Sequence, residues 1–135
     1  MTKVFLVDDY PELLALQRVF REAKFCSQPD DVEVSHSPIV ARMFERLIAI
    51  LIANDVERDG ESARLRWIQW LTIDESRDEW FAAVRRAGDD PRWESLSHAE
   101  QLDHARLLLS PFVVQPEIAD RFVLAVNQAN RQHNK

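Results

Sequence analysis

Glycine and cysteine are scarce in this sequence: its 135 residues include two glycines, Gly60 and Gly88, and one cysteine, Cys26. So little glycine excludes collagen-like chains, glycine-rich phosphate-binding loops and flexible linkers. A single cysteine excludes an internal disulfide and is typical of a reducing compartment, so we expect a cytoplasmic location. Long apolar runs are also missing, and the start of the chain is too briefly apolar for a signal peptide or a membrane span.

The residues that are present have the composition of a globular domain. Hydrophobic residues make up 46% of the chain and charged residues 30%, and we expect one domain over residues 1–130 followed by a polar tail over 131–135. With 23 acidic and 17 basic residues, the formal net charge is −6. Such a chain repels phosphate backbones, so we expect neither nucleic acid nor a membrane as a direct partner.

The hydrophobic pattern predicts alternating strands and helices. Val4–Val7 is an uninterrupted bulky run that indicates a buried strand, and Val32–Ser35 alternates as a second strand would. Between them, residues 9–24 have the helical spacing of one apolar face, and the first of them is an aspartate that can cap the helix. Ser97, with Glu100 three residues later, has the spacing of a capping box that begins another helix.

Several other segments fit either kind of element. Residues 38–55 have apolar side chains at helical intervals, but residues 48–53 also read as a strand that is buried on both faces. Trp80–Val84 is a weak strand or the middle of a helix, and Leu107–Leu109 ends a helix or begins a strand. Pro116 opens a final helix. Two architectures therefore compete: an α/β domain with a parallel sheet, and a mainly helical bundle.

Three segments resemble a known family: Lys3–Leu13, Ile50–Asp55 and Leu107–Phe112. In the first, an apolar run leads to an acidic pair at the start of a helix, and the third ends in a Ser-Pro-Phe turn. They resemble the first strand, the phosphoacceptor strand and the last strand of a response-regulator receiver domain. This resemblance spans almost the whole chain. It implies a flavodoxin-like fold with five alternating strands and helices and a central parallel sheet.

The receiver resemblance also implies a site. In that family, paired carboxylates bind Mg²⁺ beside an aspartate that accepts a phosphoryl group. Carried over to this sequence, Asp8, Asp9 and Asp55 would hold the ion, and Asp55 would be the phosphoacceptor. Ser110 stands where the family has a lysine that contacts the phosphate, and a serine supplies no positive charge. The place of the switch hydroxyl falls at Ala87-Gly88, which has none.

The preferred functional hypothesis is therefore an atypical, stand-alone pseudo-receiver of bacterial-type two-component signalling. It would act by contact with a sensor histidine kinase or a regulator protein, with phosphorylation at Asp55 optional, and a homodimer is compatible with it. The alternative hypothesis is a small acidic helical protein that sequesters a partner, of the antiactivator or immunity type. The helical spacing from Val40 to Leu51 and the scarcity of glycine favour the alternative.

The remaining side chains do not predict an enzyme. No nucleophile elbow, P-loop or dinucleotide fingerprint is present in the sequence. His98 and His104 are six residues apart, which places them on different faces of a helix, so we expect no zinc or di-iron site there. Trp67 and Trp70 lie three residues apart and are expected to pack in the core; if they are exposed, they indicate a surface for a partner.

Overall fold

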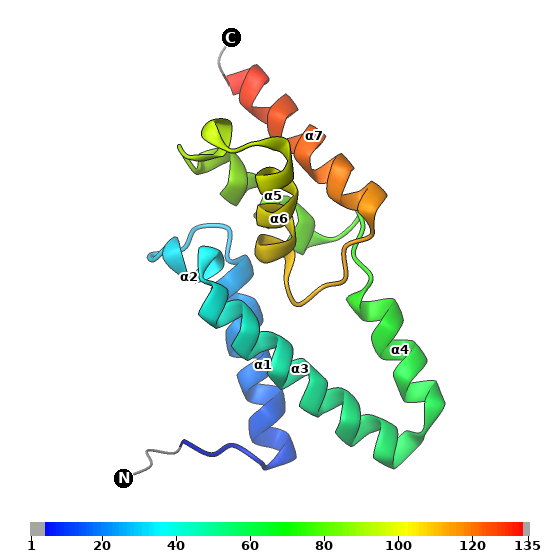
Figure 1. The fold of residues 1–135 in the computed structure, drawn as a ribbon. Helices are drawn as coiled ribbons and strands as arrows, with labels where there is room; N and C mark the ends of the chain where they lie inside the picture. The colour runs from blue at the N-terminus through cyan, green and yellow to red at the C-terminus, as the bar shows by residue number, and fades with distance from the viewer. Residues whose placement is uncertain (1–4, 134–135) are drawn as a thin grey trace.

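A computed structural model describes residues 5–133, and over this range the chain forms seven α-helices and one short 3-10 helix (Figure 1). The only β-type pairing within the described range is an isolated bridge between Thr72 and Val113. The helices are α1 (Tyr10–Phe25), α2 (Glu33–His36), α3 (Pro38–Asp59), α4 (Glu61–Leu71), α5 (Asp78–Asp89), α6 (His98–Leu109) and α7 (Pro116–His133), and the 3-10 helix is Trp93–Ser95.

The flavodoxin-like receiver fold is therefore wrong for this chain, and so is its assignment to two-component signalling. Residues 5–133 contain no strand from which a parallel sheet could be built. The alternative of a mainly helical protein is confirmed.

Each predicted strand falls elsewhere in the structure. Phe5–Val7 has no regular secondary structure, and Val4 lies outside the described residues. Val32–Ser35 is largely part of α2, residues 48–53 lie inside α3, and Leu107–Leu109 ends α6. For residues 48–53, which fit a helix or a strand, the pattern of buried side chains in α3 decides for the helix. Its buried residues repeat at helical intervals, whereas a strand buried on both faces would leave no side chain outside, and Ile50 is 47% exposed.

Two hydrophobic clusters stabilise the fold. The larger one joins α5, α6 and α7 around Trp93 and Phe122, which are fully buried. The smaller one joins α1 to α3 around Phe44 and Leu51. Partly buried side chains that pack against both clusters connect them: Phe25, Trp70 and Leu71.

α4 lies at one side of the molecule and packs chiefly on α3, with which it forms a hairpin (Figure 1). Gly60 joins the two helices with a φ of 77°, a left-handed conformation that only glycine adopts without strain. Asp59 and Gly60 thus form the corner of this hairpin. Because α4 has so few neighbours, part of its surface stays uncovered.

The predicted helix starts are largely confirmed. Ser97 accepts a hydrogen bond from the Glu100 amide, and the Glu100 carboxylate accepts one from the Ser97 amide, which completes the capping box of α6. Asp9 stands at the N-cap of α1, but its side chain makes no capping hydrogen bond. Within residues 5–133, none of the helices has both the length and the apolarity to cross a membrane.

The capping box provides a stability prediction. Ser97→Ala should lower the free energy of unfolding by about 1 kcal/mol, because the backbone amide of Glu100 at the start of α6 loses its acceptor, the Ser97 hydroxyl. Urea denaturation followed by circular dichroism measures this change. The control is Ser27→Ala in the exposed loop after α1, expected to change stability by less than about 0.5 kcal/mol. Equal losses in the two variants would show that the capping box contributes nothing.

Candidate functional site

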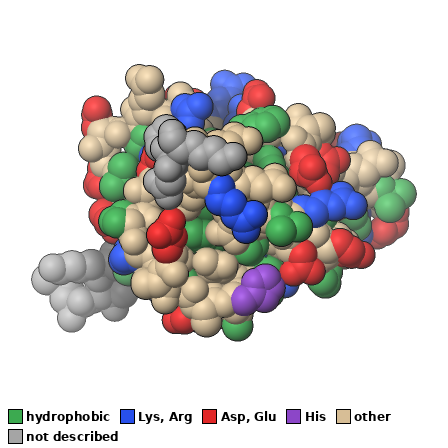
Figure 2. All heavy atoms as spheres, turned by 90° about the horizontal axis from the view of Figure 1, so that it is seen from above, with side chains coloured by type: hydrophobic (Ala, Val, Ile, Leu, Met, Phe, Trp, Pro, Cys, Tyr) green, Lys and Arg blue, Asp and Glu red, His purple; other side chains and the backbone are tan. Residues whose placement is uncertain are grey.

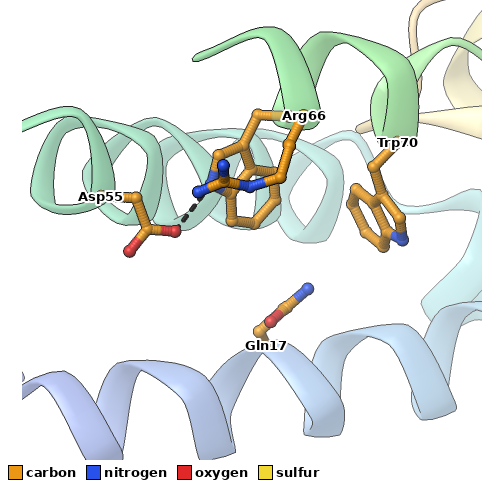
Figure 3. Close-up of a pocket in the computed structure, with 5 residues that line it drawn as sticks. Gln17, Asp55, Arg66 and Trp70 are labelled. Carbon is orange, nitrogen blue, oxygen red and sulfur yellow. Dashed lines mark hydrogen bonds between the residues drawn. The ribbon is translucent and has the colours of Figure 1, made fainter. Parts of the chain in front are cut away.

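An open groove lies between α1 and α4, beside α3 (Figure 3). Its volume is about 330 Å³. One side chain comes from α1, one from α3 and three from α4: Gln17, Asp55, Arg66, Trp67 and Trp70. Both tryptophans are half-buried. They are therefore neither fully in the core nor isolated on the surface, but form one wall of the groove.

The helical spacing of α4 explains this wall. Ala63, Trp67 and Trp70 recur at intervals of four and three residues, so they share the face that α4 turns towards α3. The two indole rings meet edge to face, with centroids 5.5 Å apart and an interplanar angle of 85°. Trp70 also packs on Phe112, at 5.0 Å between ring centroids. The larger core cluster thus anchors one end of the aromatic wall.

Asp55 connects the three helices around the groove. Its carboxylate accepts hydrogen bonds from the Tyr10 hydroxyl of α1 at 2.8 Å and from the Trp67 indole of α4 at 2.8 Å (Figure 3 shows the second). Arg58, one turn along α3, donates a third at 3.2 Å. The side chain of Asp55 is only 15% exposed. In this structure Asp55 fixes the orientation of Trp67 and offsets the charge of Arg58.

The other predicted site residues lie apart from Asp55. Asp8 and Asp9 are exposed and extended, ahead of α1. Ser110 is buried at the end of α6 and donates a hydrogen bond to Glu45. Glu45 and Asp55 are ten residues apart on α3, which corresponds to about 15 Å. The described residues form no sheet edge of the kind that suggested a site here. The roles of these residues in binding magnesium, accepting a phosphoryl group and contacting phosphate therefore stay predictions.

A buried lysine stands beside Ser110. Lys24, at the end of α1, is 3% exposed, and its amine donates to the carbonyl oxygens of Leu107, at 2.7 Å, and of Ser110. These carbonyls belong to the C-terminal end of α6, where a positive charge is favourable. Burial nevertheless lowers the pKa of Lys24 to about 7, and the nearby carboxylate of Glu45 offsets only part of this shift. Lys24 thus connects α1 to α6, but its burial makes the amine easier to deprotonate.

One group within residues 5–133 has the side chains and spacing to hold a metal ion: His36, Asp90 and His104. They come from α2, from the residue after α5 and from α6. Burial lowers the pKa of both imidazoles, so the neutral rings, with a free lone pair each, are favoured. The sequence pairs His104 most readily with its neighbour His98, which lies on a different face of α6. Nothing in the local sequence links His104 to a histidine 68 positions earlier.

Comparison of the chain with protein-family models, with curated proteins and with solved structures gives no match. By its fold and site, the described part of the chain is an all-helical protein with an aromatic groove open to solvent.

Proposed function

We propose that this protein is a small acidic helical regulatory protein that acts by binding and sequestering a partner protein, and that the α1–α4 groove is its binding site. The observation that carries the proposal is the pair of half-buried tryptophans, Trp67 and Trp70, on a helix that packs chiefly on one neighbour. Aromatic side chains in open concave sites dominate binding energy in protein complexes. A cytoplasmic location, expected from the single cysteine, is part of the proposal.

The chemistry of the groove defines the occupant. Its wall is aromatic, and the carboxylate of Asp55 is already bonded to three donors, so the interior favours an apolar side chain. One exposed arginine lines the groove: Arg66, whose side chain is 62% exposed and whose guanidinium lies 3.7 Å from the carboxylate of Asp59. Charge complementarity therefore indicates a partner helix that inserts an apolar side chain and carries glutamate or aspartate beside it.

The exposed guanidinium of Arg66 is a local positive charge in the groove, whereas the chain as a whole has a net charge of −6. Figure 2 shows acidic and basic side chains intermixed on the face of the molecule that is seen from above. Long-range attraction would favour a basic partner, whereas the groove favours an acidic one. A preference for an acidic peptide would thus distinguish binding in the groove from general electrostatic attraction to the acidic chain.

The test uses two synthetic helical peptides with the same Leu/Phe face, one with glutamates and one with lysines on the opposite face. We expect the glutamate peptide to bind the full chain at least about tenfold more tightly than the lysine peptide, as measured by isothermal titration calorimetry. Arg66→Glu, at an exposed position, should weaken the glutamate peptide about tenfold. Trp67→Ala should weaken both peptides, because the apolar wall is lost.

Arg85→Glu is the matched control, an exposed arginine on α5 away from the groove. It makes the same charge change as Arg66→Glu and should leave the affinity for the glutamate peptide unchanged. Preference for the lysine peptide, or equal losses in the two arginine variants, would overturn the assignment of the groove.

A further inference from the structure

Three side chains from separate elements converge beside the middle of α6. The Nδ1 atom of His36 lies 3.2 Å from the Nε2 atom of His104, and a carboxylate oxygen of Asp90 lies 3.9 Å and 3.7 Å from these two nitrogens. In tetrahedral zinc sites the metal–nitrogen bonds are about 2.0–2.1 Å, so two imidazole ligands stand about 3.3 Å apart. The two histidine nitrogens already have this spacing. The distances from the carboxylate oxygen to these nitrogens exceed it by only about half an ångström.

The surroundings of the cluster fix these side chains in place. The exposed fractions of the side chains are 8% for His36, 5% for Asp90 and 16% for His104. Arg92 holds the carboxylate of Asp90 with two guanidinium hydrogen bonds, at 3.0 and 3.1 Å, and its amide adds a third at 2.9 Å. The two imidazole rings stack at 17°, with centroids 5.2 Å apart. Partners of this kind orient ligands in metal sites and raise their affinity.

From this geometry we propose that His36, Asp90 and His104 bind one divalent transition-metal ion of the Zn²⁺ type. Two imidazole nitrogens and one carboxylate oxygen are ligands that Zn²⁺ prefers, whereas Mg²⁺ and Ca²⁺ prefer oxygen alone. The site is separate from the α1–α4 groove and from the predicted magnesium ligands. Binding would replace the hydrogen bond between the two rings by two bonds to the ion, and the rings would turn so that both nitrogen lone pairs point at it.

A fourth ligand position faces a cavity of about 200 Å³ that the three ligands line together with Glu33, Arg92 and Leu96. Glu33 lies one helical turn before His36 on α2. Three protein ligands and one open position are the arrangement of zinc sites that exchange a water or a small ligand, rather than of closed structural sites. The ion would therefore be reachable from solvent.

Binding would also have a structural effect. α2 has only four residues, and the ion would hold it against the end of α5 and against α6. Because the site exists only in the folded chain, the ion should raise the melting temperature.

The experiment is a titration of the full chain, free of any affinity tag and of bound metal, with Co²⁺ and then with Zn²⁺. We expect one equivalent of Co²⁺ to give the visible absorption of a tetrahedral site and one equivalent of Zn²⁺ to displace it. His36→Gln and His104→Gln should each weaken Zn²⁺ binding by more than about a hundredfold, since loss of a second-shell partner alone costs about ten- to a hundredfold. His98→Gln is the matched control, on the same helix as His104 with a side chain 67% exposed, and should bind normally.

A second readout on the unaltered chain does not depend on how the variants fold. Zn²⁺ should shift the imidazole NMR signals of His36 and His104 and leave those of His98 in place. The proposal is overturned if no stoichiometric binding occurs, if His98→Gln weakens it as much as His104→Gln, or if the His98 signals are the ones that shift.

Discussion

Replacing Phe122 by alanine should lower the free energy of unfolding by about 3–5 kcal/mol, the range expected when a fully buried aromatic side chain is truncated. Phe122 is 0% exposed and lies at the centre of the larger core cluster. Its ring meets Trp80 edge to face at 5.3 Å and Trp93 at 6.4 Å between centroids. These neighbours belong to other elements and are themselves buried, so they cannot move into the cavity left by the ring.

Urea denaturation followed by circular dichroism measures this loss, and Leu124→Ala is the control. Leu124 is on the same helix as Phe122 but is 58% exposed, so its truncation should change stability by less than about 0.5 kcal/mol. Similar losses in the two variants would contradict the packing of α7 against α5 and α6.

The second large effect is a dependence of stability on pH that arises from Lys24. Its pKa is about 7 in the folded chain and 10.5 in the unfolded chain. Between these two values the unfolded chain binds more protons, so stability rises with pH over this window and falls as the pH drops towards 7. Raising the pH from 7 to 9 should therefore stabilise the protein by about 2 kcal/mol.

Lys24→Met isolates this effect because it removes the titrating amine but keeps an apolar chain of similar length in the same place. The variant should lose most of the rise in stability between pH 7 and 9, as measured by urea denaturation at both values. An identical rise in the variant and in the unaltered protein would show that Lys24 is charged at pH 7 in the folded chain. Its contact with the end of α6 would then keep the amine protonated despite its burial.

The sequence predicts the helices well where a local signal marks them. The Ser97–Glu100 spacing, Pro116 and the apolar face of residues 9–24 all correspond to helix boundaries or faces in the structure. Short apolar runs are where the sequence predicts strands that the structure does not contain within residues 5–133. Residues 48–53 fit a strand and a helix equally well, and only the packing of α3 on α1 and α4 decides between them.

The candidate sites depend on contacts that no local pattern records. The sequence singles out Trp67 and Trp70 as an aromatic pair that is expected to pack in the core, but the groove that they line exists only because α1 and α4 meet beside α3. The cluster of His36, Asp90 and His104 joins residues far apart in the chain. The acidic pair Asp8 and Asp9 was conspicuous in the sequence, yet the structure leaves both exposed ahead of α1.

The central claim is that the α1–α4 groove is the surface that binds a partner, and the four tryptophans report on it directly. Trp67 and Trp70 line the groove, whereas Trp80 and Trp93 are 3% and 0% exposed in the other cluster. In a ¹H–¹⁵N correlation spectrum recorded during titration with the glutamate peptide, the indole signals of Trp67 and Trp70 should shift while those of Trp80 and Trp93 stay fixed. Shifts confined to Trp80 and Trp93, or none at all at saturating peptide, would contradict the account.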